Sequence, residues 1–480
     1  MNKNIFISII VLFFSVNYIY AQEMLGLANS NYAGLQALKL NPGVLSDSRL
    51  KYDINLVSFD IFGRNNYVFI PSGAVSLFRA IDGSQKEVPP PKDKFTEPPK
   101  DFYFSSGLML PSVLISLRKH TFGFHIAGRG YVNADNVPFH IAKFMYDGID
   151  FKPLHDIEFS DGKYSVAAQG WLEYGFTYSG VLYNKRRNYF SGGLNLNFNK
   201  GLMAAYYLNT DLQYTVPNDD TILVRKMKGE LGYALPDGSK KIWAGTGTGF
   251  DLGFCYERKQ SYRNSSVFKR SLIETYDVKV GASLLDVGKI NYSGNVTNVV
   301  KMETDSAIVP VSHIRSLDSP QDLESVVNRD FYHNTNPPGH SGWSMSLPTA
   351  ASFQFDYNMD NYYYVNGTII LNLTSPGKNV NRARELAVSL RYETKWLGFG
   401  IPLTFYNIEK PMLGFNIRIH SFFIGSDNFL PALGIGKIYG SSVFFGIKIS
   451  GFKERWAYRD RSMYLPSIKG IFRPFWKKKL

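Results

Sequence analysis

Cysteine is nearly absent from this chain of 480 residues, in which Cys255 is the only one. A single cysteine excludes an intramolecular disulfide framework and leaves too few thiolates for a cysteine-based zinc or iron–sulfur site. Charged residues are also scarce, at 19% of the sequence, where about a quarter is usual. No second long apolar run follows the one at the N-terminus, which argues against a bundle of membrane-spanning helices.

Short catalytic and metal-binding motifs are missing too. The eight histidines form no H-E-x-x-H pair, and no G-x-S-x-G turn is present. The run Gly245–Gly249 resembles a phosphate-binding loop, but no Lys-Ser/Thr follows it, and the alternating segment Phe250–Phe254 continues it as a strand. We therefore expect a protein that is not an enzyme and that holds no cofactor and no metal ion.

One apolar stretch opens the chain. Residues 1–21 begin with a short polar start containing Lys3, continue with the apolar run Ile5–Phe14 and end at Ala21, a small residue suited to cleavage. This order is typical of a secretory signal peptide and predicts export from the cytoplasm. The alternative is an uncleaved N-terminal membrane helix.

Aromatic residues are abundant, since 31 Tyr and 36 Phe contribute to an aromatic share of 15%. Aromatic bands at two membrane interfaces, a polar interior and frequent turns would together produce this composition in a transmembrane β-barrel. A secreted β-sandwich shares part of it, so composition alone leaves both folds open.

Strict alternation of apolar and polar residues is the main evidence for strands. It occurs in the segments Phe122–Arg129, Leu194–Asn199, Phe353–Tyr357 and Phe415–His420. A period of two gives each strand an apolar face, which lies toward lipid in a barrel and toward the interior in a soluble sandwich. We predict an all-β fold, a transmembrane antiparallel β-barrel over residues 51–451 with about 14 strands, in a range of roughly 12–16.

The polar faces of these strands would point into the barrel. Two interpretations stay open for them: a solute pathway or ligand cavity, or a hydrogen-bonded polar core that fills and stiffens the barrel. The expected inward residues are Arg129, Asn195, Asn197, Gln354, Asp356, Arg391, Arg418 and His420.

Tight turns and long loops separate the expected strands. Turn-rich pairs at Asn199–Gly201 and Asp286–Gly288 are interpreted as hairpins. Long loops are expected at 79–101, 132–163, 217–241 and 301–342, the second with a helix around Phe139–Tyr146. If the first strand runs outward from the periplasm, several of these loops would fall on the periplasmic rim, opposite to the usual pattern. Either an early strand between Gln22 and Leu50 is missing from the count, or one assigned strand is wrong.

Residues 22–50 are expected to form a periplasmic or plug segment in front of the barrel. Leu35 and Leu38 have helical spacing, and the apolar pattern ends at Asn41, Pro42 and Gly43. Proline and glycine stop a helix, so these three residues are the predicted hinge of a short helical plug.

The C-terminal segment 452–480 is strongly basic, with nine lysines and arginines against two acidic residues, and the whole chain has a net charge of +13. We expect outer-membrane lipid, lipopolysaccharide or protein partners in the cell envelope for such a tail, and no nucleic acid, because the chain is exported. A solvated tail without a partner is the alternative. The basic residues are Lys453, Arg455, Arg459, Arg461, Lys469, Arg473, Lys477, Lys478 and Lys479.

Two patches resemble known barrels. The stretch from Leu25 to the Asn41–Gly43 turn is similar to the N-terminal region of fatty-acid-transporter-like barrels. The stretch Phe422–Leu430, which contains Gly425, Ser426, Asp427 and Asn428, and the stretch Val443–Ile449 resemble the closing strands of an uncharacterised Bacteroidota outer-membrane barrel family. The resemblance implies an outer-membrane location, with the N-terminal segment inside or beneath the barrel, and brings no catalytic or ligand residue with it.

Two functions follow as hypotheses. The first is an accessory or scaffold subunit of an envelope complex for secretion or assembly, which would use the long loops and the basic tail. The alternative is a transporter or channel for a small solute, hydrophobic ones included, with the plug as its closure. A third hypothesis, outside the barrel fold, is a soluble secreted β protein.

Overall fold

The structure is a computed structural model that describes residues 24–453, except for residues 77, 78, 80, 81, 85, 86 and 97 and the stretches 237–241, 260–275, 295, 316–319, 333–339, 361 and 408–409. The expected signal peptide, and the basic tail from Arg455 onward, lie outside the described residues.

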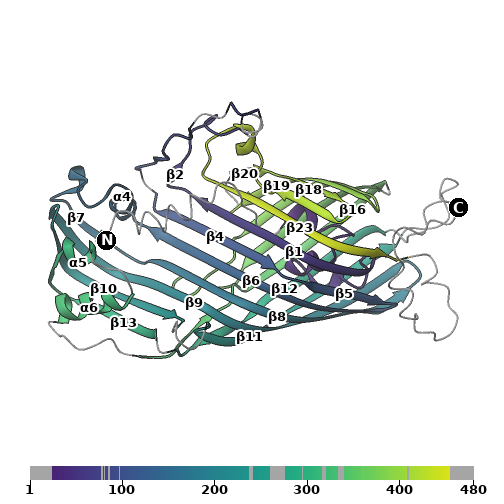
Figure 1. Ribbon diagram of the computed structural model, residues 1–480, viewed down its shortest axis with the longest axis horizontal. Coiled ribbons are helices and arrows are strands. Elements are labelled where there is room, and N and C mark those ends of the chain that lie inside the picture. Colours follow the sequence, from purple (N-terminus) through teal and green to yellow (C-terminus); the bar gives the residue numbers. More distant parts are fainter. Residues whose placement is uncertain are drawn as a thin grey trace.

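The chain forms one closed antiparallel barrel of 14 strands, which confirms the predicted fold class (Figure 1). Closure comes from the pairing of the first and last strands, in which Asp60 lies opposite Phe444. Several barrel strands consist of two or three consecutive pieces. In chain order they are β1 (Leu50–Asn65), β4 (Lys100–Met109) with β5 (Ser112–Leu117), β6 (His120–Val137), β7 (Glu158–Asp161) with β8 (Tyr164–Lys185), β9 (Asn188–Asn218), β10 (Thr221–Leu235) with β11 (Gly245–Lys259), β12 (Tyr276–Tyr292) with β13 (Val296–Thr304) and β14 (Ala307–Pro310), β15 (Trp343–Ser346) with β16 (Ala350–Asp360), β17 (Tyr363–Asn372), β18 (Glu385–Glu393), β19 (Leu397–Tyr406), β20 (Lys410–Leu413) with β21 (Phe415–Ile419), β22 (Phe422–Ser426) and β23 (Gly440–Phe452).

Helices and one small sheet complete the described structure. The N-terminal segment contains α2 (Leu25–Ala28) and the 3-10 helices η1 (Gly34–Lys39) and η2 (Pro42–Val44), so the expected plug helix is shorter and tighter than an α-helix over 30–40. The connections contain α4 (Phe139–Asp147), η3 (Lys152–Leu154), α5 (Val311–Arg315), α6 (Pro320–Tyr332), η5 (Leu430–Leu433) and the paired strands β2 (Val68–Phe69) and β3 (Lys92–Asp93). Among the described helices, none is long and apolar enough to cross a membrane.

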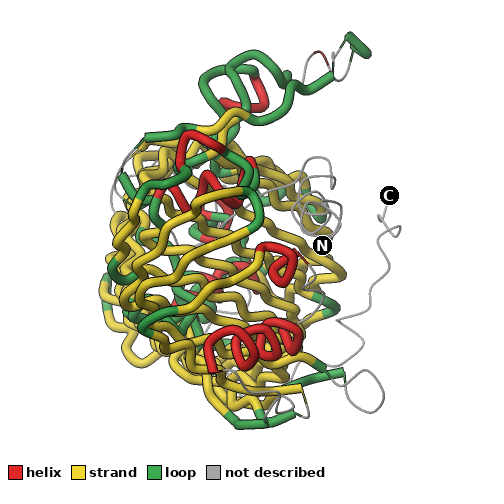
Figure 2. Tube along the Cα trace, turned by 90° about the vertical axis from the view of Figure 1, so that its left-hand side faces the viewer, coloured by secondary structure: helices red, strands yellow, loops and turns green. Residues whose placement is uncertain are grey.

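The two rims of the barrel differ clearly. Short turns join β5 to β6, β8 to β9, β16 to β17, β18 to β19 and β21 to β22, all at the end where β1 begins and β23 finishes. The long connections between described strands lie at the opposite end, which faces the viewer in Figure 2. Short turns mark the periplasmic rim of such barrels, so the rims have the usual orientation, and the reversal came from strands that were wrongly assigned.

Two interpreted hairpins caused that reversal. The segments Asn199–Gly201 and Asp286–Gly288 are not turns, because β9 and β12 run straight through them. Both sites are bulges: the β8–β9 register shifts at Gly201, and Asp286 has a φ of +54° where the β11–β12 register shifts. A bulge uses the same turn-forming residues as a hairpin but leaves the strand direction unchanged.

The expected long loops are correspondingly shorter. Strand β10 occupies most of the expected loop 217–241, strands β13 and β14 begin the expected loop 301–342, and strands β6 and β7 extend into 132–163. The predicted helix at 139–146 is confirmed as α4. These strands were missed because they continue past the membrane, where the alternation that reveals a lipid-facing strand weakens.

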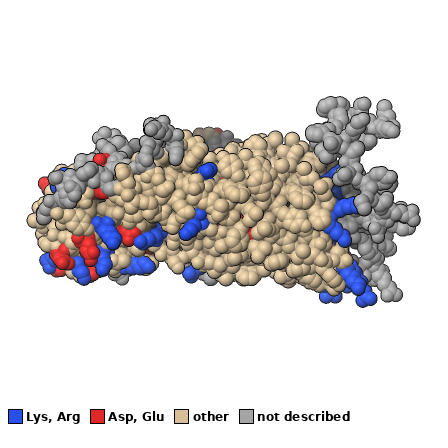
Figure 3. Space-filling view, turned by 90° about the horizontal axis from the view of Figure 1, so that it is seen from below, with Lys and Arg blue, Asp and Glu red and all other residues tan. Residues whose placement is uncertain are grey.

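The apolar faces of the strands point outward. On β9, Leu194, Leu196 and Phe198 are exposed by 38–53%, whereas Asn195 and Asn197 between them are 2–3% exposed. The same arrangement recurs on β11, β16, β18 and β19. Figure 3 shows the result as a broad band with few charged side chains between the two ends. A closed barrel with an apolar exterior and a polar interior spans a membrane.

One side of the barrel rises far beyond the membrane. Strand β9 has 31 residues, whereas about 10 suffice to cross a bilayer. Above the apolar band Tyr206 still points inward, toward Trp343, and Tyr207 on the opposite face packs with Ala142 of α4 in one cluster and Val327 of α6 in another. The helices therefore cover the outer face of this extension, which would otherwise present apolar residues to water.

Candidate functional site

The N-terminal segment 24–49, here called the plug, lies inside the barrel. Its Leu35 and Leu38 pack against Met109 and Ala127 on one wall, while Leu25 contacts the opposite wall in a cluster with Ala350, Ile370 and Ala387. Nearly all plug residues are buried. Burial of this apolar surface against both walls holds the plug across the lumen.

The predicted hinge forms a wedge at the centre of the plug. The Asn41 side chain accepts a hydrogen bond from the Gly43 amide (2.7 Å) and donates to Gln354 Oε1 (2.9 Å) and to the Phe254 carbonyl (3.0 Å). A Cβ added at Gly193 would lie 2.3 Å from the Pro42 carbonyl oxygen, so this close approach requires glycine in the wall. In this conformation the three residues are fixed to the barrel.

Ion pairs anchor the periplasmic side of the plug. Asp47 pairs with Lys259 (2.7 Å) and Lys279 (3.3 Å), and both lysines also pair with Glu257. Burial alone would raise the pKa of Asp47, but the two lysines outweigh it and hold that pKa below its ordinary value. Lys448 donates to the carbonyls of Tyr32 (2.8 Å) and Ala33 (2.9 Å).

A second segment enters the lumen from the other end. The connection between β17 and β18, residues 373–384, folds inward and is called here the inner loop. Its Val380 is fully buried, and the Asn381 amide donates to Asn133 Oδ1 on β6 (2.9 Å). Lys378 pairs with Glu230 on β10 (2.5 Å). The inner loop therefore crosses from its own strands to the opposite wall.

The plug and the inner loop meet at one carboxylate. Asp286 accepts hydrogen bonds from Arg129 Nη1 (2.6 Å) and Nη2 (2.8 Å) and from Arg382 Nη2 (2.6 Å). Arg382 also donates to the Lys39 carbonyl of the plug (3.3 Å), and Lys39 pairs with Asp60. The positive φ of Asp286 at its bulge places this carboxylate inside the barrel. The wall, plug and loop are thus joined in one network.

A cavity of about 70 Å³ lies at this meeting point. Positively and negatively charged side chains both line it. The cavity therefore offers hydrogen-bond donors and acceptors, and its electrostatic potential is not dominated by charges of one sign. Among the described residues no group of three or more His, Cys, Asp or Glu could hold a metal ion. The charged lining residues are Lys39, Asp60, Arg129, Glu173, Asp251, Asp286 and Arg382.

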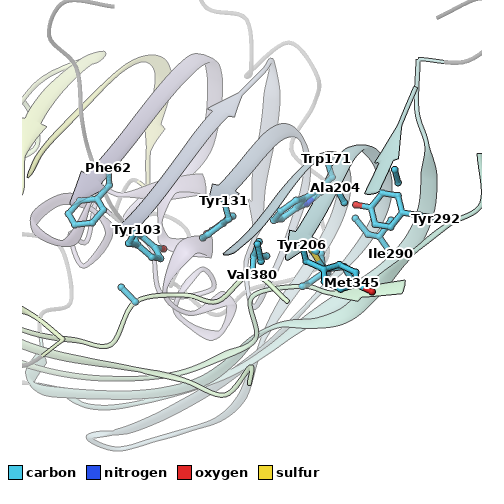
Figure 4. Packing of buried hydrophobic residues seen from close by; sticks show 14 of the residues in the cluster. Phe62, Tyr103, Tyr131, Trp171, Ala204, Tyr206, Ile290, Tyr292, Met345 and Val380 are labelled. Carbon is cyan, nitrogen blue, oxygen red and sulfur yellow. The ribbon is translucent and has the colours of Figure 1, made fainter. Parts of the chain in front are cut away.

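Aromatic side chains fill the lumen beside this cavity. Tyr131, which lines the cavity, stacks on Trp171 with ring centroids 5.7 Å apart. The stacked pair belongs to a buried cluster that extends along the lumen (Figure 4). Buried rings of this kind present large flat apolar surfaces. Other aromatic members of the cluster are Phe62, Tyr103, Tyr206, Tyr292 and Tyr406.

The expected lumen residues mostly point inward but do not line an open pore. Asn195 and Asn197 hydrogen bond to Asp251, Gln354 binds the plug at Asn41, and Arg391 pairs with Asp356 (2.5 Å). Arg418 is buried and donates to the carbonyls of Thr394 and Lys395. His420 differs from the expectation, because it lies in the β21–β22 turn and stacks on Trp396.

The C-terminal patch and the tail have local structural contacts. The amides of Asp427 and Asn428 donate to Ser442 Oγ, and Ser426 Oγ lies 3.3 Å from that atom, so the patch ties the end of β22 to β23. A Cβ at Gly425 would lie 2.4 Å from the Phe444 ring. Of the basic tail, the structure describes Lys453, which donates to the Ser46 carbonyl (3.0 Å).

Sequence reasoning missed the inner loop, Asp286 as a bulge residue and Arg382. The stretch 373–384 contains three basic residues beside Pro376 and Gly377, a composition that also suits an exposed loop. Its inward position depends on partners far away in the sequence, since Arg382 and Asp286 are 96 residues apart.

The sequence matches a family model described as a family of unknown function (DUF5723) over residues 42–427. The chain belongs to this family. No curated protein matches it. With its closed, apolar-sided barrel, this member of the family is an outer-membrane protein, as the resemblance implied.

Several solved structures are similar to the chain over most of its length. They include the Ralstonia pickettii toluene transporter TbuX, with 9% identity over 88% of this chain and 95% of that chain and a TM-score of 0.38. A TodX deltaS2S3 mutant monoaromatic hydrocarbon channel has 9% identity over 90% and 99%, with a TM-score of 0.37. A Pseudomonas aeruginosa FadL homologue has 8% identity over 90% and 98%, with a TM-score of 0.21. Such identities transfer no residue role to this chain.

Proposed function

We propose that this DUF5723 member is a channel for a small solute that has a ring-shaped apolar body and a polar group, and that it is not an enzyme. The observation that carries the proposal is the arrangement inside the barrel. An aromatic lumen lies directly beside a cavity with charges of both signs, and that cavity sits where the plug and the inner loop meet. Aromatic rings favour flat apolar molecules, and the charged groups would hold a polar substituent.

The conformation described here is closed. The cavity measures about 70 Å³, and a cavity that accepts benzene is about 150 Å³. A single-ring solute therefore needs more room than this state provides. Arg382 connects the two obstructing segments, since it binds both Asp286 and the Lys39 carbonyl. Movement of the inner loop would enlarge the cavity and weaken the hold on the plug.

Influx into liposomes tests the proposal. Benzoate and benzylamine serve as ring-bearing probes of opposite charge, and glucose serves as a polar solute without an aromatic ring. We expect the intact protein to admit a ring-bearing probe faster than glucose, and Arg382→Ala to raise that rate. Lys226→Ala, which removes an ion pair with Asp211 on the extension, is the matched control and should leave the rate unchanged. Failure of every probe to enter through both proteins, or equal entry of glucose, would refute the proposal.

A scaffold subunit is the second candidate function. One observation favours it: the extension of β9 and its neighbours carries its own helical cover and has no need of such height to cross a membrane. If the extension grips a partner, purification in mild detergent should retain that partner, and truncation of the β9–β10 hairpin above the apolar band should release it. A protein purified alone under these conditions would count against a scaffold.

A further inference from the structure

Exposed cations gather on the outer wall at the periplasmic end of the barrel. The set called here the basic rim comprises Lys119 in the β5–β6 turn, Lys185 and Arg186 at the β8–β9 turn, and Arg258 near the end of β11. Figure 3 shows lysine and arginine side chains at the right-hand end of the barrel, beyond the apolar band.

These cations are close neighbours on adjacent strands. Lys185 and Arg258 both lie opposite Asn188, one on each side of β9. Two strand spacings separate them, about 10 Å. The Lys119 carbonyl accepts a hydrogen bond from the Val181 amide of β8 (2.9 Å), which brings the β5–β6 turn beside the same strand. Lys119 lies about 13 Å along β8 from Lys185, because four residues separate Val181 from Lys185, so it forms the edge of the basic rim.

The side chains of Lys185 and Arg258 lie on the lipid-facing side of the wall. Two residues before each of them stand Tyr183 and Tyr256, which are 49% and 40% exposed. Residues two apart share a face, and they are separated by about 7 Å along a strand. Tyrosine marks the interface of the hydrocarbon with water, so a cation about 7 Å further toward the periplasm lies at the depth of the lipid headgroups.

The described residues supply no ion pair to the four cations of the basic rim. The exposed cations of the extension differ in this respect: Arg225 pairs with Glu158, Lys226 with Asp211 and Lys228 with Glu303. At the periplasmic end Arg187 pairs with Asp277, while Glu257 is buried inside the barrel with Lys259 and Lys279. Within the described part of the chain, the basic rim is thus a group of cations without paired carboxylates.

We propose that the basic rim binds the phosphate groups of anionic phospholipids in the periplasmic leaflet. The depth and outward direction of Lys185 and Arg258 suit a lipid headgroup, and so does the lack of a described carboxylate partner for all four cations. Each cation near an anionic surface strengthens binding by about fivefold. Four adjacent cations would therefore hold an anionic lipid against exchange with the bulk bilayer. This proposal is independent of what passes through the lumen.

Lipid retention by the full chain tests this proposal. The protein is reconstituted in nanodiscs of phosphatidylcholine with a minor share of phosphatidylglycerol, then extracted gently, and the lipids that stay bound are counted by native mass spectrometry. We expect phosphatidylglycerol to be enriched several-fold over its share of the bilayer. The triple variant Lys185→Gln, Arg186→Gln, Arg258→Gln should reduce this enrichment to the bulk ratio.

A matched triple variant on the extension, Arg225→Gln, Lys226→Gln, Lys228→Gln, removes the same number of exposed cations and should leave the enrichment intact. Heat-dependent gel mobility confirms that each variant is folded. Enrichment that survives in the rim variant, or that is lost equally in both variants, would overturn the proposal. So would a wild-type protein that retains the two lipids in their bulk ratio.

Discussion

Replacement of Asp286 by asparagine removes the charge that joins the wall to the inner loop. Asp286 is 2% exposed and forms ion pairs with two arginines, Arg129 and Arg382. Loss of one partner from a buried ion pair costs about 3–5 kcal/mol, because the remaining charge is left uncompensated. Arg129 would still pair with Glu173 at 3.3 Å. Most of the lost stabilisation therefore concerns Arg382 and the closed position of the inner loop.

A cost of about 3 kcal/mol on the closed loop corresponds to a rise of roughly 100-fold in the population of the open loop. Thiol labelling of Val380→Cys reports this opening, since Val380 is fully buried in the closed state. Cys255, also buried, is replaced by alanine in this background. We expect Asp286→Asn to accelerate labelling by about two orders of magnitude, whereas Asp211→Asn on the extension should not. An unchanged labelling rate in a folded Asp286→Asn protein would refute the reasoning.

Three further predictions concern the plug and the wall. Because the pKa of Asp47 is held below its ordinary value of 3.8, its ion pairs stabilise the docked plug at and above that pH and are lost as pH falls through the lowered pKa. The protection factors of residues 24–49, that is, their hydrogen exchange relative to the intrinsic rate at each pH, should thus be constant from neutral pH down to about 5 and fall only in stronger acid. Gly193→Val should expose the plug to protease in a folded barrel, since its Cβ would meet the Pro42 carbonyl at 2.3 Å, whereas Gly367→Ala meets nothing within 4 Å and should not. Leu196→Arg, on the lipid face, should lower barrel stability by about 2–4 kcal/mol in denaturant unfolding, and a smaller effect than from Lys226→Ala would contradict the outward orientation of that face.

Alternation predicted the barrel because burial of one face and exposure of the other to lipid constrain every second residue. Leu194–Asn199 shows this directly, with leucines and phenylalanine outward and asparagines inward. The same pattern could not distinguish a bulge from a hairpin. Asn199–Gly201 and Asp286–Gly288 contain residues suited to both, and only the pairing of the neighbouring strands decides between them.

The candidate site was less predictable for a different reason. Arg129 and the Asn41–Gly43 wedge were singled out from local pattern and resemblance; the wedge is the centre of the plug, and Arg129 lines the cavity beside it. The central carboxylate and the inner-loop arginine were not, because their roles come from contacts across the lumen. Arg129 and Asp286 are 157 residues apart, and no local pattern encodes such a pairing.

The claim that the lumen is a solute path closed by the inner loop can be tested most directly by locking that loop. Asn381 and Asn133 are hydrogen bonded across the lumen, so cysteines at both positions, in the Cys255→Ala background, would tie the loop to β6 under oxidising conditions. Influx of the ring-bearing probe that the intact protein admits, benzoate or benzylamine, should stop on oxidation and return when dithiothreitol is added. Influx that continues at the same rate through the cross-linked protein would contradict the account.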